Sequence, residues 1–192
     1  MSMETLPLPG RQRALRERHA AILLALCVVC AAVNLTKAVH MDDAAYLGIV
    51  DAILRDPLHV MSALLNWHNT AEPIAEINQP HLFFYLQALV TIVFGRSELA
   101  QHLLVTGVTS VAVVLFYRLA VLVAPGRPLL LTALFALGPA FLPGQNLMVD
   151  VPLVALWLLF FWAIFLGPFL SPWPWRNHGS HISMLQISLP TH

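Results

Sequence analysis

Long runs of apolar residues alternate with short polar segments along the whole chain. The runs occupy residues 20–39, 82–94, 103–117 with a continuation to 124, 129–142 and 151–166. A helix that crosses the hydrocarbon core of a bilayer needs roughly 20 residues. The first and third runs meet that length, whereas those at 82–94 and 129–142 are short. We expect each short run either to borrow flanking residues or to be a half-span that is buried among its neighbours.

The later short run carries breaks that the earlier one lacks. Gly138-Pro139 and Pro143-Gly144 interrupt it or follow it closely. Proline removes a backbone donor and clashes with the preceding turn of a helix. We therefore expect the broken helix in the run at 129–142.

A second kind of pattern follows the first apolar run. From residue 42 to 54 the apolar residues recur at intervals of three and four, which predicts an amphipathic helix. They are Tyr46, Leu47, Ile49, Val50, Ile53 and Leu54. We expect this helix to lie along a membrane surface, with Asp42 and Asp43 at its N-terminal end, where the helix dipole favours ionised carboxylates.

The composition is that of a membrane protein. Hydrophobic residues make up 58% of the chain and charged residues 10%, and soluble domains are about half apolar and carry roughly a quarter charged residues. The net charge is +0, which gives no indication of nucleic-acid binding. The predicted fold class is all-α: a polytopic transmembrane helical bundle whose outer loop carries a juxtamembrane amphipathic helix.

The charges are distributed unevenly and predict an orientation. Before the first run stand Arg11, Arg13, Arg16 and Arg18, whereas the segment 40–81 holds six acidic residues and one basic one, Arg55. Because Lys and Arg stay preferentially on the cytoplasmic side, we expect a cytoplasmic N-terminus. A cleaved signal peptide is the competing reading, but no A-x-A-type site follows Val39. The predicted location is a cell membrane, as a multi-pass protein of a bacterial inner membrane.

These observations divide the chain into five parts. A basic cytoplasmic N-terminus covers 1–19, the first transmembrane helix 20–39 and an extracytoplasmic acidic loop 40–81. Further transmembrane or half-span helices follow over 82–166. The tail, 167–192, contains four prolines and is expected to be irregular.

Three aspartates are the candidates for chemistry. Asp42 and Asp43 could orient a divalent cation or take a proton from a hydroxyl, or they could be an ordinary acidic first turn. Asp150 lies at the edge of an apolar run, where a carboxylate is a functional hypothesis by default. It could also cap a helix, because Pro152 follows two residues later. Asp150 shares the outer face with the pair only if one of the short runs turns back.

Histidines offer little support for a dedicated metal site. His59, His68 and His81 lie in or next to the acidic loop, without the paired H-x-x-x-H spacing of a zinc cage. No cofactor is assigned; a divalent cation is the one considered, and its ligands stay open.

Several short motifs, in this order, resemble the N-terminal part of GT-C type membrane glycosyltransferases. They are D-D/E-x-x-Y from Asp42, N-x-P-x-L-F-F-Y-L from Asn78, F-G-x-S-E-L-A-x-H-L-L from Phe94 and M-x-D-V-P-L from Met148. The family includes the protein O-mannosyltransferases of family 39 and the lipid A aminoarabinose transferases. The resemblance covers roughly residues 15–166.

The resemblance implies transfer of a sugar from a polyprenyl-phosphate donor to an acceptor hydroxyl on the extracytoplasmic face. The partners would be that donor lipid and the bilayer. Asp42, Asp43 and Asp150 match the acidic positions of the family's site. Substrate contacts are expected from Tyr46, His68, Asn78, Gln79 and Pro80.

Two departures limit what is carried over. Aminoarabinose transferases commonly have an acidic-lysine-proline-proline sequence where this chain has Asn78, Gln79, Pro80 and His81, so both charges are missing. Family members are also several times longer, so we expect a truncated chain. The alternative is a non-catalytic membrane scaffold or assembly subunit, in which the loop acids only cap helices and interact with water.

Overall fold

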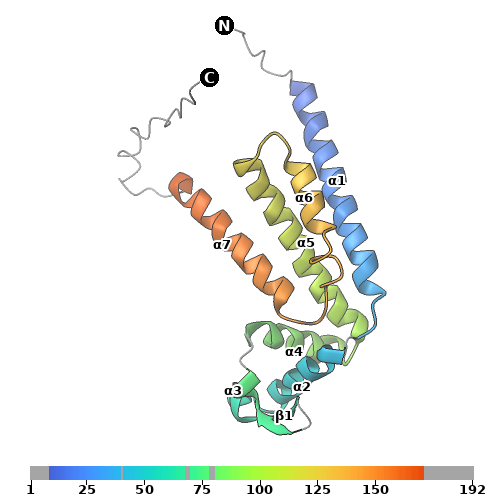
Figure 1. The fold of residues 1–192 in the computed structure, drawn as a ribbon, viewed down its shortest axis with the longest axis vertical. Coiled ribbons are helices and arrows are strands. Elements are labelled where there is room, and N and C mark those ends of the chain that lie inside the picture. The colour runs from blue at the N-terminus through green and yellow to red at the C-terminus, as the bar shows by residue number, and fades with distance from the viewer. Residues whose placement is uncertain (1–8, 40, 68–69, 78–80, 171–192) are drawn as a thin grey trace, which may run out of the picture.

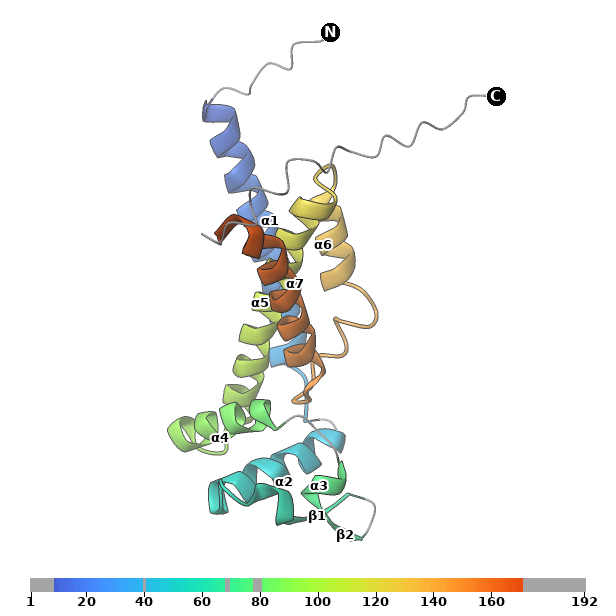
Figure 2. The same cartoon turned by 90° about the vertical axis from the view of Figure 1, so that its left-hand side faces the viewer.

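The computed structural model describes residues 9–39, 41–67, 70–77 and 81–170, and is mostly helical over them. Helices α1, α5, α6 and α7 run along the long axis of the molecule and form what we call the body (Figure 1). The described residues between 41 and 94 fold into a smaller unit, the cap, at the end of the body away from the start of α1 (Figures 1 and 2). The mainly helical class is confirmed.

Helix α1 spans Pro9–Leu35 and therefore begins well before residue 20, where the first transmembrane helix was expected. Part of the predicted basic N-terminus is thus helical. Proline is favoured in the first turn of a helix, and Arg13 and Glu17, four residues apart, form an ion pair of 2.9 Å on the helix surface.

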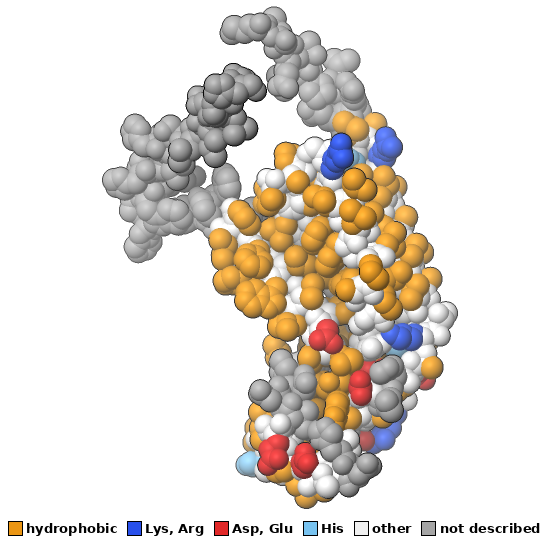
Figure 3. All heavy atoms as spheres, in the orientation of Figure 1, with side chains coloured by type: hydrophobic (Ala, Val, Ile, Leu, Met, Phe, Trp, Pro, Cys, Tyr) orange, Lys and Arg blue, Asp and Glu red, His pale blue; other side chains and the backbone are white. Residues whose placement is uncertain are grey.

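Two helices of the described chain are long and apolar enough to cross a membrane, namely α1 over Arg13–Leu35 and α5 over Glu98–Val123. Their outer faces carry exposed Leu and Val side chains, and α7, Asp150–Leu170, exposes Leu, Trp and Phe. In Figure 3 hydrophobic side chains cover most of the visible face of the body, whereas Asp and Glu side chains are seen only toward the cap. An apolar surface of this extent is typical of a protein that contacts lipid.

The cap is built on α2, Met41–Arg55, and α4, Leu82–Phe94. The predicted amphipathic helix forms, and its apolar face packs against protein. Tyr46, Ile49 and Val50 are buried against Phe84 and the neighbouring apolar residues of the cap. The apolar stripe of α2 therefore forms the core of the cap.

The segment between α2 and α4 contains a small β-hairpin that the all-α expectation did not include. A 3-10 turn at Val60–Ser62 leads into strands β1, Leu64–Asn66, and β2, Ala71–Pro73, which pair antiparallel, and helix α3, Ile74–Ile77, follows. Gly48 of α2 allows the hairpin to lie close, because a Cβ there would stand 2.6 Å from Cδ1 of Leu65.

Helix α4 has 13 residues, which gives a length of about 20 Å, less than the roughly 30 Å of a hydrocarbon core. It lies across the end of the body instead of continuing along it (Figures 1 and 2). The chain then turns at Gly95, whose φ of 69° favours glycine, and Ser97 caps α5 by accepting from the Ala100 amide.

Helix α5 is the centre of the body and packs against α1, α6 and α7. Helix α6, Pro128–Ala136, ends just before Gly138-Pro139, which confirms the expected broken helix. The chain from 137 to 149 continues without regular helix toward the cap, and α7 then runs back along the body (Figure 1). Asp150, at the start of α7, is therefore at the same end of the molecule as α2.

Candidate functional site

The paired aspartates of α2 occupy different environments. Successive residues of a helix point about 100° apart, so Asp42 and Asp43 cannot share one face. Asp42 is half-buried, whereas Asp43 is 0% exposed. The Asp43 carboxylate accepts a hydrogen bond of 2.9 Å from the backbone N–H of Leu147, which is 104 residues farther along the chain. Asp43 therefore connects the cap to the segment that leads into Asp150.

The peptide unit of Leu147 is held from a second side as well. Gln87 of α4 donates from Nε2 to the Leu147 carbonyl at 3.0 Å. Gln101 of α5 in turn donates to the Gln87 carbonyl at 3.0 Å and to the Thr91 hydroxyl at 2.9 Å. Breaking a buried hydrogen bond of this kind costs free energy, because the separated donor or acceptor cannot form a hydrogen bond with water instead. Helices α2, α4 and α5 together thus position the chain immediately before Asp150.

Tyr46 lies within electrostatic reach of all three aspartates, Asp42, Asp43 and Asp150, which we call the acidic cluster. Its ring is 2% exposed, stacks on Phe84 with centroids 5.4 Å apart and meets Trp67 edge-on at 5.3 Å. Burial raises the pKa of the Tyr46 hydroxyl, and the negative charges of Asp150, Asp42 and Asp43 raise it further. All three carboxylates therefore lie within electrostatic reach of one phenol.

The structure places Asp150 at the cap end of the molecule, where α7 begins (Figure 1). It is exposed and lies in the first turn of α7, together with Pro152. It reaches the cap because α4 does not cross the body and because the chain after α6 returns to the cap end. Helix α4 is thus the short run that does not continue along the body (Figures 1 and 2).

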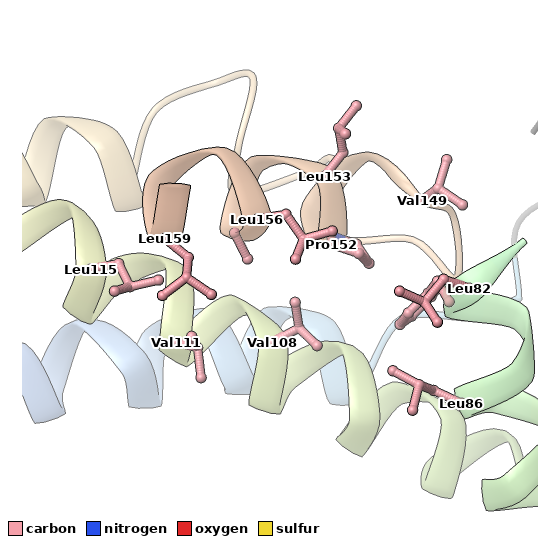
Figure 4. Close-up of a pocket in the computed structure, with 12 residues that line it drawn as sticks. Leu82, Leu86, Val108, Val111, Leu115, Val149, Pro152, Leu153, Leu156 and Leu159 are labelled. Carbon is pink, nitrogen blue, oxygen red and sulfur yellow. The ribbon is translucent and has the colours of Figure 1, made fainter. Parts of the chain in front are cut away.

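An apolar groove of about 210 Å³ begins beside the first turn of α7 (Figure 4). Side chains of α5 and α7 form its walls, and Leu82, Phe83 and Leu86 of α4 contribute at the cap end. Val149 and Pro152, which flank Asp150 in sequence, also line it. Asp150 thus stands near one end of a groove lined by apolar residues.

The remaining predicted residues give a mixed result. His68, Asn78, Gln79 and Pro80 lie outside the described residues. Within the described ranges, no three Asp, Glu, His or Cys side chains are grouped so that they could hold a metal ion.

Of the histidines considered as metal ligands, two have other contacts. His59 contacts the Asp56 carboxylate at 3.0 Å. This hydrogen bond lowers the pKa of Asp56. The ring of His81 meets Phe84 edge-on with centroids 6.2 Å apart.

Sequence reasoning missed the two glutamines that hold the site together. Gln87 is polar within the apolar run 82–94, and Gln101 precedes the third run. A polar residue inside an apolar segment is a signal of an internal contact, and this signal was present in the sequence for Gln87. Which backbone group it bonds, by contrast, depends on the fold.

Comparison with protein-family models, curated proteins and solved structures finds no match to this chain. The chemistry open to the site follows from its exposed and half-buried carboxylates. Asp42 and Asp150 can take a proton from a hydroxyl or contribute ligands to a divalent cation. Asp43 is committed to the Leu147 amide and is suited to positioning.

Proposed function

We propose that this chain belongs to a membrane glycosyltransferase, or is part of one, that transfers a sugar from a polyprenyl-phosphate donor to an acceptor hydroxyl. The observation that carries the proposal is the position of Asp150 in the first turn of α7, beside one end of an apolar groove and near enough to Tyr46 to act on the same phenol as Asp42 and Asp43. A lipid-linked sugar has the same two parts, an apolar chain and a polar head. The order of the sequence motifs supports the same activity.

The groove suits the prenyl chain of the donor. It is lined only by apolar side chains and runs between α5 and α7, from the cap end toward the other end of the body (Figure 4). Binding sites for small molecules are commonly concave and largely apolar, with a few polar groups that fix orientation. A prenyl chain in the groove would bring its phosphate and sugar to the first turn of α7, where Asp150 lies.

Asp42 is the proposed base. The acceptor oxygen attacks the anomeric carbon and its proton passes to the Asp42 carboxylate, while the bond from that carbon to the phosphate oxygen breaks. The electron pair of the broken bond leaves with the polyprenyl phosphate. Asp43 keeps the Leu147 segment in place and does not take part in proton transfer.

The phosphate of the donor is negatively charged and would be repelled by three carboxylates. A divalent cation between Asp42, Asp150 and the phosphate would offset this repulsion. Magnesium is usually bound through one or two carboxylates together with substrate phosphates, so two protein ligands are sufficient. The proposal therefore includes a cation that binds with the donor.

The membrane arrangement is part of the proposal. The body would cross a bacterial inner membrane several times. The N-terminus would lie in the cytoplasm, and the cap would lie outside. The basic residues at the start of α1 support this orientation. Labelling of single cysteines at positions 13 and 150 with a membrane-impermeant reagent tests it: we expect label only at 150, and label only at 13 would reverse the orientation.

The activity is tested with purified protein in liposomes, a labelled polyprenyl-phosphate sugar and Mg²⁺. Asp42→Asn should abolish transfer of label while leaving membrane insertion intact. The matched control is Asp56→Asn, because Asp56 is exposed and pairs with His59 instead of facing the cluster. Equal transfer by the unaltered protein and Asp42→Asn would rule out Asp42 as the base.

A non-catalytic scaffold or assembly subunit is the second candidate, and one observation favours it. Asp43, a carboxylate that is 0% exposed, accepts a backbone hydrogen bond from Leu147. If the three carboxylates are purely structural, no transfer is detected with any donor, and Asp42→Asn lowers only the stability, because it removes a charge from the first turn of α2.

A further inference from the structure

A second pocket lies between the end of α1 and the first turn of α5. Its volume is about 480 Å³, and it is open to the surface. Leu35 and Leu99 provide apolar walls, and Lys37, Glu98 and His102 provide polar groups. The sugar-transfer proposal uses none of these residues.

The proton on the His102 ring is located by its neighbour Asn34. The Asn34 side chain donates from Nδ2 to the His102 carbonyl at 2.9 Å and to the Thr106 hydroxyl at 2.7 Å. This fixes the amide so that Oδ1, an acceptor, faces His102 Nδ1 at 3.2 Å. In the neutral ring Nδ1 must then carry the hydrogen, and Nε2 is an acceptor.

Two acceptors are therefore brought together in this pocket. The His102 ring is 1% exposed, and its Nε2 has no hydrogen-bond partner among the described residues. It stands 3.9 Å from Oε1 of Glu98, which already accepts from the Val39 amide at 2.9 Å. A buried acceptor without a donor is unfavourable, so this position calls for a ligand with N–H or O–H groups.

Lys37 provides the opposite charge in the same pocket. Its ammonium donates to the Pro143 carbonyl at 2.6 Å and to the Asn146 side-chain oxygen, both neutral. Within the described part of the chain no carboxylate lies at ion-pair distance from it. With Glu98 negative and Lys37 positive, the pocket matches a ligand that carries both charges.

We propose that this pocket binds the phosphoethanolamine headgroup of a membrane lipid. The ammonium donates to His102 Nε2 and to the Glu98 carboxylate, and Lys37 attracts the phosphate. A lipid source fits because the exposed apolar residues Val33, Leu99 and Leu103 provide a surface for acyl chains next to the pocket. This site goes beyond sugar transfer and does not depend on it.

The geometry predicts which headgroup is preferred. A primary ammonium has three N–H donors, whereas the quaternary ammonium of choline has none and cannot satisfy His102 Nε2 or Glu98. We expect phosphatidylethanolamine to bind about tenfold more tightly than phosphatidylcholine with the same acyl chains. The measurement is native mass spectrometry of the full chain in detergent, titrated with each lipid, and equal affinities for the two lipids would overturn the proposal.

Two variants test whether the preference for phosphatidylethanolamine arises in this pocket. Glu98→Gln keeps an oxygen for the Val39 amide but removes the charge, and should reduce the preference for phosphatidylethanolamine several-fold. Glu17→Gln is the matched control, because Glu17 is exposed and pairs with Arg13 near the start of α1. An unchanged preference in Glu98→Gln would place the binding elsewhere.

A membrane lipid and free phosphoethanolamine carry the same headgroup, and competition between them shows which one the pocket binds. If the pocket takes a lipid, the free compound should displace phosphatidylethanolamine only at concentrations far above those of the lipid. Displacement at equal concentration would overturn the lipid source and assign the pocket to a soluble ligand.

Discussion

The hydrogen bond between Asp43 and Leu147 allows the sharpest test of the structure. Asp43→Ala removes the acceptor and leaves the Leu147 N–H without this bond at a site where both residues are 0% exposed. A buried donor that loses its partner costs about 1–3 kcal/mol. The substitution also removes one charge from the first turn of α2, which is worth about 0.3–1 kcal/mol.

Asp42→Ala is the control, because it removes a charge from the same helical turn but leaves the bond to Leu147 in place. The two variants differ in the buried bond to Leu147, and we expect Asp43→Ala to be less stable than Asp42→Ala by about 1–3 kcal/mol. This corresponds to a change of roughly 5- to 150-fold in the unfolding constant.

The assay is equilibrium unfolding in mild detergent by titration with SDS, followed by tryptophan fluorescence and far-UV circular dichroism. Coincident transitions by the two probes would support a two-state analysis. Equal stability of the two variants would mean that Leu147 is not anchored by Asp43, and the reason given for the position of Asp150 would fail.

Three further predictions concern the cap. Asp150→Asn should lower the pKa of Tyr46, because burial and the nearby carboxylates raise it. An ultraviolet pH titration, with Tyr46→Phe as the reference, measures this pKa. An unchanged pKa would mean that Asp150 does not lie near Tyr46. Phe84→Ala should cost about 3–5 kcal/mol of unfolding free energy in the SDS titration, because the ring is 0% exposed, and a loss below about 1 kcal/mol would contradict its place in the core. His59→Ala should raise the pKa of Asp56, followed by carboxyl NMR, because the histidine hydrogen bond lowers it. Since the folded pKa of Asp56 is depressed, its contribution to stability is present above the ordinary carboxyl pKa and is lost as the pH falls through the folded value.

The local elements could be predicted because their causes are local. The apolar runs that became α1 and α5 are long enough for a span, and Gly138-Pro139 follows the end of α6 directly. The acidic first turn of α2 also follows from the position of Asp42 and Asp43 at the start of an amphipathic pattern. The hairpin was missed because its strands have only three residues each and their pairing depends on the surface of α2.

The apolar face of α2 has a sequence pattern that is the same for a helix packed against lipid and for one packed against protein. Residues such as Ile49 and Val50 repeat at helical spacing whether the helix meets lipid or protein, since both remove apolar groups from water. The sequence predicts the stripe and not what covers it. In the folded chain the covering surface is α4 and the hairpin, whose contacts with α2 are nonlocal.

By itself the sequence determined a helical, apolar chain with carboxylates at the start of α2 and α7, because periodicity and charge act over a few neighbouring residues. Only the tertiary structure decided that Asp150 lies at the same end of the molecule as Asp42 and Asp43. That outcome depends on α4 lying across the body and on the chain after α6 returning to the cap, and the peptide of Leu147 is held there by Asp43 and Gln87. Long-range hydrogen bonds of this kind have no signature in local spacing, since the partners of Leu147 are 104 and 60 residues away.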